Sequence, residues 1–143
     1  MSVLNNDLLS IFLRFHESAM THSEARNFCE NELQIPARLV EIDSEEENNA
    51  IFTEIIRRGF KEKKIDVWLG ITDRHSEGAW VLESNGESVT YTNWKANEPN
   101  NDNAGEDCAH MLSDGKWNDR DCEYKQEPST WAERWLWTAL CEV

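Results

Sequence analysis

Four widely separated cysteines constrain the fold of this chain more than any other feature of its sequence. They are Cys29, Cys108, Cys122 and Cys141. No two of them form a Cys-x-x-Cys pair, and no cysteine–histidine spacing fits a structural zinc site. An even number of distant cysteines favours two disulfide bonds and an oxidising compartment. The alternative is four buried free thiols in a cytosolic protein.

The length and charge of the chain limit its organisation and its partners. The 143 residues predict one domain that spans residues 1–143. The chain has 28 acidic and 14 basic side chains, which gives a formal net charge of −14. Such a charge disfavours nucleic acids and anionic membranes, and it favours cations. No apolar stretch is long enough to form a transmembrane helix.

The first residues carry no recognisable export signal. Residues 8–15 are apolar, but Asp7 precedes them, Arg14 interrupts them, and no small-residue cleavage site follows. This pattern does not fit a signal peptide. Because the cysteines indicate an oxidising compartment, we still expect a secreted, extracellular protein whose export signal is not visible in this chain.

The first 60 residues show two amphipathic helices. Each begins at a capping box, at residues 21–24 and 44–47. Helical spacing places Cys29 on the buried face of the first helix. The second helix has an apolar stripe and a stop signal at residues 57–59. The stripe consists of Ile51, Phe52, Ile55 and Ile56.

Short strands and turn signals dominate the rest of the chain. Asp114-Gly115 is the strongest hairpin signal, and Ser84-Asn85-Gly86 is a second one. Helices followed by short antiparallel strands define the α+β class. We expect strands at residues 11–15, 38–42, 67–71, 79–82, 88–91, 108–113, 116–122 and 135–141.

Oxygen donors gather around a long segment without periodicity, residues 92–105. Calcium binds six to eight oxygens from carboxylates and amide carbonyls. The sequence contains no EF-hand loop, so we expect these donors to form a site assembled from separate loops. The donors are Glu98, Asn100, Glu106, Asp107, Asn118 and Asp119.

Three short motifs and the cysteines resemble those of the C-type lectin-like domain over nearly the whole chain. Trp68-Leu69-Gly70 is similar to the family's WIG core motif. Glu98-Pro99-Asn100 is similar to the EPN motif of mannose-type members, and Trp117-Asn118-Asp119 to the WND motif. The resemblance implies a double-loop fold in which two helices flank small antiparallel sheets. It also implies the disulfides Cys29–Cys141 and Cys108–Cys122.

The resemblance further implies a calcium ion, Ca²⁺, that binds both the protein and a sugar. A cis peptide bond before Pro99 would turn the side-chain oxygens of Glu98 and Asn100 to one side. The ligands of this ion, which would also contact the sugar, would be Glu98, Asn100, Glu106, Asn118 and Asp119.

A second calcium, found in some members, would use Asp73, Glu77, Asn101 and Asp107, with help from Glu106. Three features depart from the family pattern. The position of Asn101 often holds an aspartate, and residues 123–134 resemble an inserted loop. This loop is either a solvated excursion, or a lip on the sugar site or an oligomer contact. Domains of the family also often carry an extra N-terminal cysteine pair, which is absent here.

The donor and acceptor order of the motif residues suits vicinal equatorial hydroxyls. Carboxylates accept hydrogen bonds and amide NH₂ groups donate them. The 3- and 4-hydroxyls of mannose, glucose or GlcNAc, and a matching pair on fucose, have this arrangement. Galactose is usually recognised by a Gln-Pro-Asp motif with a stacking tryptophan, and the 98–106 loop has neither. We expect Trp94 and Trp117 to lie in the core.

We therefore predict a calcium-dependent lectin of mannose-type specificity that recognises glycans or microbial surfaces. The alternative is a calcium-stabilised scaffold of the same fold that binds protein, mineral or ice. We expect no enzymatic activity, because His16, His22, His75 and His110 form no recognisable triad. His110 shares strand parity with Cys108, so we expect it to be packed. Weak single-site sugar binding would favour a homo-oligomer.

Overall fold

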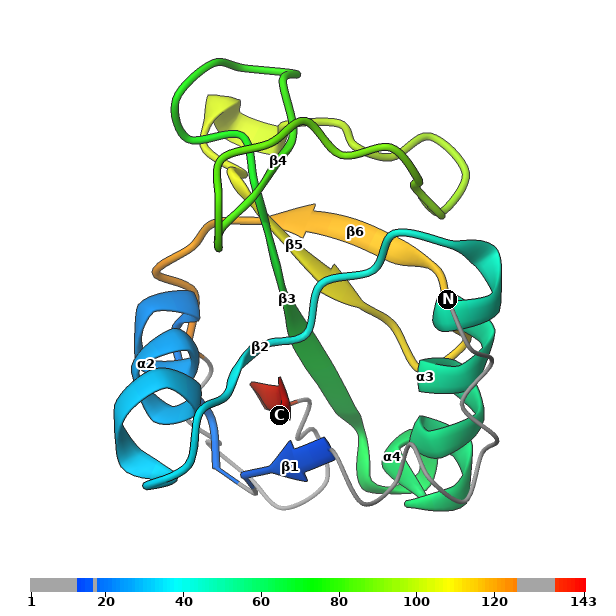
Figure 1. Cartoon of the computed structure of the whole chain (residues 1–143). Coiled ribbons are helices and arrows are strands. Elements are labelled where there is room, and N and C mark those ends of the chain that lie inside the picture. The colour runs from blue at the N-terminus through cyan, green and yellow to red at the C-terminus, as the bar shows by residue number, and fades with distance from the viewer. Residues whose placement is uncertain (1–12, 17, 126–135) are drawn as a thin grey trace.

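A mixed β-sheet runs through the protein, with α2 on one side and α3 and α4 on the other (Figure 1). The computed structural model describes residues 13–16, 18–125 and 136–143. The strand order is β1-β7-β3-β5-β6, with β2 paired to β7 and β4 paired to β3. The helices are α2 His22–Asn27, α3 Glu45–Arg57 and α4 Phe60–Lys63, and the strands are β1 Leu13–Phe15, β2 Arg38–Leu39, β3 Ile65–Thr72, β4 Val81–Leu82, β5 Cys108–Met111, β6 Trp117–Arg120 and β7 Leu136–Glu142.

The α+β class predicted from the sequence is confirmed, with one departure in the sheet. β3 and β7 pair in parallel, whereas every other strand pair within the described residues is antiparallel. All eight residues of β3 are buried, as expected for a central strand. The expected hairpin over residues 79–91 is reduced to the two-residue β4 and a single bridge between Val81 and Ser88.

The first capping box is confirmed. The Thr21 hydroxyl accepts the Glu24 backbone N–H at 3.2 Å, and the Glu24 carboxylate accepts the Thr21 N–H at 2.9 Å. The helix then continues as a π-helical segment, Phe28–Glu32, which the sequence did not predict. Cys29 is fully buried on this segment, as expected.

The second capping box is half formed. The Ser44 hydroxyl caps the Glu47 N–H at 3.1 Å, but the Glu47 carboxylate accepts from the Asp43 N–H at 3.2 Å instead of reaching back to Ser44. In the predicted stripe, Ile51 and Ile55 are buried and Phe52 is half-buried, but Ile56 is 49% exposed, so the buried stripe does not extend to Ile56. Successive residues of a helix are rotated by about 100° around its axis, so Ile56, at the end of the stripe, lies past the edge of the surface that faces the sheet.

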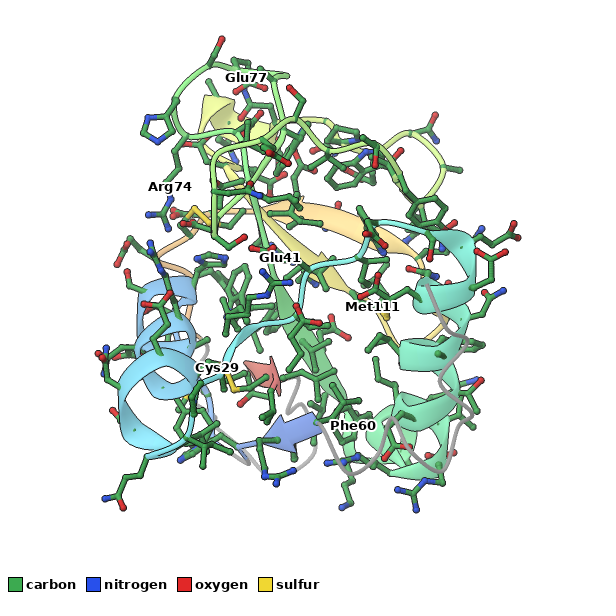
Figure 2. The ribbon with its side chains drawn as sticks, viewed as in Figure 1. Cys29, Glu41, Phe60, Arg74, Glu77 and Met111 are labelled. Atoms are coloured by element: carbon green, nitrogen blue, oxygen red, sulfur yellow. A yellow bond between two sulfur atoms is a disulfide. The ribbon has the colours of Figure 1, made fainter. Side chains whose placement is uncertain are left out.

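Two disulfides join distant parts of the fold in the pairs that the resemblance implies. Cys29–Cys141 connects the π-helical segment to β7, and Cys108–Cys122 closes the hairpin of β5 and β6. Figure 2 shows the first sulfur bridge beside the end of β7. The second lies at the end of the hairpin that carries Asn118 and Asp119.

The β5–β6 hairpin turns at Asp114-Gly115, as its sequence predicts. Gly115 has φ +82°, which favours glycine, and Leu112 accepts the Gly115 N–H at 2.9 Å. Trp117 at the start of β6 is fully buried, and Trp94 packs against it with ring centroids 5.7 Å apart. The expectation of a core position is confirmed for Trp117, whereas Trp94 is half-buried and packs against the core.

The described residues contain no helix that is both long and apolar enough to cross a lipid bilayer. Residues 126–134 of the predicted insert, and the first part of the predicted strand at residues 11–15, lie outside the described residues.

Candidate metal centre

Three carboxylates from separate segments converge where the long loop meets the β5–β6 hairpin. Glu98 lies in the loop, Glu106 lies just before β5, and Asp119 lies on β6. One carboxylate oxygen from each lies within 4.8 Å of the other two. The peptide bond between Glu98 and Pro99 is cis, as the motif implies.

Asp119 fixes the loop to the sheet. Its side chain is fully buried, and its two oxygens accept the backbone N–H groups of Asn100 at 3.2 Å and Asn101 at 2.7 Å. Hydrogen bonds to an ionised acceptor are stronger than those between neutral groups. Asp119 therefore positions the Glu98-Pro99-Asn100 motif against β6.

Further hydrogen bonds close the loop on itself. The side-chain oxygen of Asn101 accepts the Glu106 N–H at 3.0 Å, and Glu106 accepts the Asp102 N–H at 3.2 Å. The Asn100 amide donates to Glu98 at 3.2 Å. The loop thus presents its carboxylates and amides in a fixed arrangement.

Two buried oxygens of the predicted ligand residues lack hydrogen-bond partners within the described part of the chain. They are one carboxylate oxygen of Glu98 and the side-chain oxygen of Asn118. Buried polar atoms are rarely left unsatisfied in native proteins, and coordination of an ion is one accepted explanation. Both atoms are hard oxygen donors, which is the chemistry that calcium prefers. The residues therefore fit a calcium ion.

The electrostatics of the cluster also favour a cation. Burial raises the pKa of Glu98, and the Asp119 carboxylate raises it further. Burial likewise raises the pKa of Glu106, with a contribution from Asp119. Like charges held this close disfavour one another, and a bound cation would remove the penalty.

A second cluster lies at the tip of the neighbouring loops. Oxygens of Asp73, Glu77 and Asp107 lie within 4.8 Å of one another. Glu77 is exposed at the outer edge of the molecule (Figure 2), whereas Asp73 is 2% exposed and has one oxygen without a partner. Burial and the charges of Asp107 and Asp119 raise the pKa of Asp73.

His110 is packed, as predicted, but it also contacts the metal centre. It is fully buried, and the Trp137 indole N–H donates to its Nδ1 at 3.1 Å. Its Nε2 lies 3.4 Å from the side-chain amide of Asn118. This contact could have been inferred from the sequence, because the register of the hairpin places His110 directly opposite Asn118.

A mixed sheet flanked by helices, with oxygen donors gathered on long loops at one end, defines a C-type lectin-like domain. The chain belongs to the C-type lectin domain family: residues 18–128 match the family model. The family consists of non-enzymatic carbohydrate-binding domains, so the prediction that the chain is not an enzyme is confirmed.

Individual relatives agree with this assignment. A hepatic lectin of Gallus gallus is 33% identical over 112 residues, which cover 78% of this chain and 49% of that protein. The chain spans about a third to a half of the length of the curated relatives it matches.

Two solved structures are similar over most of the chain. The mouse scavenger receptor C-type lectin carbohydrate-recognition domain is 29% identical, with a TM-score of 0.72, covering 92% of this chain and 88% of that one. The cow C-type carbohydrate-recognition domain of CD23, solved in the presence of a GlcNAc2Man3 oligosaccharide, is 30% identical, with a TM-score of 0.70, covering 92% and 85%.

Proposed function

We propose that this chain is a calcium-dependent carbohydrate-recognition domain, spanning residues 1–143, with mannose-type specificity. The observation that carries the proposal is the convergence of Glu98, Glu106 and Asp119, beside buried oxygens that lack partners. Calcium would be held by these carboxylates together with Asn100 and Asn118. When bound, the ion supplies open coordination positions for sugar hydroxyls.

The protein groups around that ion set the sugar preference. Glu98 and Glu106 accept hydrogen bonds, while the amides of Asn100 and Asn118 donate them. Each of two vicinal equatorial hydroxyls would then meet one acceptor and one donor, as well as the metal. The axial 4-hydroxyl of galactose would break this match on one side.

The comparisons support a sugar as the ligand. The CD23 domain was solved with an oligosaccharide that contains mannose and GlcNAc. The name of the hepatic lectin likewise identifies a sugar-binding protein. The intact order of donors and acceptors favours a sugar over a mineral or ice, because those surfaces do not require alternation around one ion.

We also propose a second calcium at Asp73, Glu77 and Asp107. The Asp73 oxygen without a partner supports it. The Asn101 side chain is already bonded to the Glu106 N–H, so it would contribute to this site mainly by holding the loop. This ion would be structural and would not contact the sugar.

The setting of the domain follows from the disulfides and the family. Domains of this family are typically extracellular or on the cell surface, and both disulfides suit an oxidising compartment. We propose that this chain is extracellular. A shallow site that meets two hydroxyls binds weakly, so we further propose that glycans or microbial surfaces are bound by a homo-oligomer.

The double change Glu98→Gln with Asn100→Asp tests the specificity. It retains a calcium-binding oxygen at each position and reverses the donor and acceptor order. A mismatched polar pair costs about 1–3 kcal/mol, so mannose affinity should fall by about one to two decades. The gain for galactose should be smaller, because the described loop offers no exposed tryptophan.

Competition by free mannose and free galactose against an immobilised glycan, at saturating calcium, gives the readout. The matched control is Glu87→Gln with Asn85→Asp, which makes the same exchange in an exposed turn. If the double variant at 98 and 100 binds calcium and keeps its preference for mannose, these residues do not read the sugar.

A further inference from the structure

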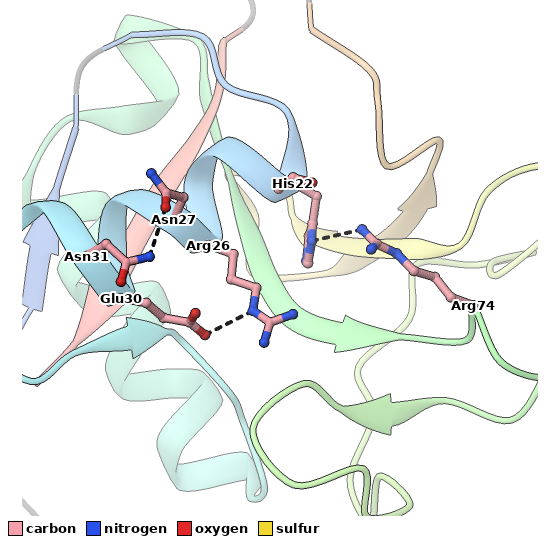
Figure 3. A pocket seen from close by; sticks show the side chains of 7 residues that line it. His22, Arg26, Asn27, Glu30, Asn31 and Arg74 are labelled. Atoms are coloured by element: carbon pink, nitrogen blue, oxygen red, sulfur yellow. Dashed lines mark hydrogen bonds and ion pairs between the residues drawn. The ribbon is translucent and has the colours of Figure 1, made fainter.

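A second hollow lies apart from the metal centre, between α2 and the turn that follows β3. Its volume is about 240 Å³, and it is lined by polar and charged side chains of α2 and of the π-helical segment Phe28–Glu32, together with Arg74 (Figure 3). None of the carboxylates of the two candidate calcium clusters lines it. Pockets for drug-sized ligands measure roughly 300–1,000 Å³, so this one suits a smaller molecule.

Arg74 reaches this hollow without a negatively charged partner. Its guanidinium donates to the sulfurs of Cys122 at 3.4 Å and Cys108 at 3.3 Å, and to Nδ1 of His22 at 3.4 Å. Among the described residues no carboxylate lies within ion-pair distance of it. Sulfur is a weak acceptor, so these contacts orient the guanidinium without neutralising it.

The lack of a carboxylate is notable in this chain, where acidic side chains outnumber basic ones by two to one. Arg26, in the same hollow, is fully paired by comparison. It contacts Glu30 at 2.9 Å and Glu83 at 2.9 Å. Arg74 is therefore the cation of the hollow that has no ion-pair partner among the described residues, whereas Arg26 has two.

His22 helps to hold the Arg74 guanidinium in position. It is fully buried, and its Nε2 lies 2.8 Å from the Leu69 carbonyl, so Nε2 carries the proton and Nδ1 accepts from Arg74. Burial lowers the pKa of His22 to about 4, which keeps the ring neutral at physiological pH. The contact thus holds Arg74 in place and adds no charge.

We propose that this hollow binds a small ligand that carries one carboxylate next to hydroxyl groups, such as an acidic monosaccharide. Arg74 would pair with the carboxylate through Nη1, because Nε and Nη2 already donate to the disulfide sulfurs and to His22, and a charge-assisted hydrogen bond is stronger than a neutral one. Glu30 and Asn27 would accept from and donate to the hydroxyls. Glu30 also disfavours a second negative charge on the ligand.

A chemical-shift titration of the ¹⁵N-labelled, calcium-saturated protein tests the proposal, because it locates each ligand. The probes are sodium glucuronate, sodium acetate and neutral glucose at constant ionic strength. We expect saturable shifts of the Arg74 side-chain signal and the Ser23 amide with glucuronate. Acetate shows whether the carboxylate suffices or the sugar hydroxyls are also needed. Binding at the metal centre would instead shift Asn100 and Asn118.

Matched variants separate this pocket from a general effect of charge. Arg74→Gln should weaken glucuronate binding in the hollow by about 10- to 100-fold, because a charge-assisted bond is lost. Lys61→Gln makes the same change of charge at an exposed site on α4 and should leave the affinity unchanged. Ser23→Leu should block the hollow with Arg74 intact.

Three results would overturn the proposal. One is the absence of saturable shifts at Arg74 and Ser23 with either carboxylate. Another is glucose binding there as well as glucuronate does. The third is an equal loss of affinity in Arg74→Gln and Lys61→Gln. Because the metal centre is followed through its own signals, its failure and that of this pocket are distinguishable.

Discussion

Replacing Asp119 with asparagine should remove the stabilisation by calcium at the primary cluster while leaving the fold intact. The side chain keeps its size and one accepting oxygen, so the buried contact to the Asn101 N–H can persist. The other oxygen becomes an NH₂ group that faces the Asn100 N–H, a donor against a donor. Without calcium this mismatch should lower the free energy of unfolding by about 1–3 kcal/mol.

Loss of the Asp119 charge should stabilise the metal-free protein, which opposes the cost of the hydrogen-bond mismatch. Asp119 raises the pKa of both Glu98 and Glu106, so removing its charge relieves repulsion in the metal-free protein. The net cost in EDTA should therefore fall in the lower part of that range. With calcium, the wild-type protein gains about 2.7 kcal/mol at a hundredfold excess over Kd, and the variant loses this gain.

The assay is thermal unfolding of both proteins in EDTA and in calcium. A difference of about 2.7 kcal/mol corresponds to about 8 °C for a domain of this size, at about 3 °C per kcal/mol. Calcium at the proposed second cluster would stabilise both proteins equally, so its effect would cancel when the two increments are subtracted. Glu123→Gln, an exposed carboxylate just beyond β6, is the matched control. A variant at position 119 with the full wild-type increment would refute the assignment of Asp119.

Three further outcomes follow. The folded-state pKa values of Glu98 and Glu106 are raised, so acidification from about pH 7 to about pH 5 should stabilise the protein in EDTA and reduce its stabilisation by calcium. Unfolding curves with EDTA and with calcium at each pH measure both effects. A stabilisation by calcium that does not change with pH would argue against this reasoning. Replacing Cys108 and Cys122 by serine should lower the free energy of unfolding by about 3 kcal/mol in a denaturant titration, and it should also weaken calcium binding. An unchanged calcium affinity would show that the disulfide does not support the site. Gly115→Ala should destabilise by about 1–3 kcal/mol, because of its positive φ and a Cβ placed 3.0 Å from the Phe52 ring, and an unchanged midpoint would contradict this.

Local signals in the sequence predicted the parts of the fold that local physics determines. The Thr21–Glu24 capping box and the Asp114-Gly115 turn each depend on residues within a few positions of one another. The disulfide pairs and the cis bond before Pro99 came from the family resemblance, because cysteine spacing alone left the pairing open.

Contacts between distant segments could not be predicted in the same way. The parallel pairing of β3 with β7 joins residues about half the chain apart, and no periodicity encodes it. The short helix α4 was missed because its stability comes from burial of Phe60 against Phe15, with ring centroids 4.4 Å apart, and not from its own sequence. The contact of Arg74 with His22 likewise spans 52 positions.

Describing the candidate metal centre required both the sequence motifs and the contacts between distant segments. The resemblance named Glu98, Asn100, Glu106, Asn118 and Asp119. The structure brings the carboxylates of Glu98, Glu106 and Asp119 together, and Asp119 accepts the Asn100 N–H. The tertiary structure alone showed which oxygens lack partners and how tightly the backbone of the loop is held. These features depend on burial and hydrogen-bond geometry, which a sequence pattern does not specify.

Binding to an array of glycans, in calcium and after addition of EDTA, tests the central claim most directly. We predict binding to glycans with terminal mannose, GlcNAc or fucose, loss of that binding in EDTA, and its return when calcium is restored. Glycan binding that persists in EDTA would contradict a calcium-bridged site. So would the absence of binding to any of these sugars by a protein that calcium demonstrably stabilises.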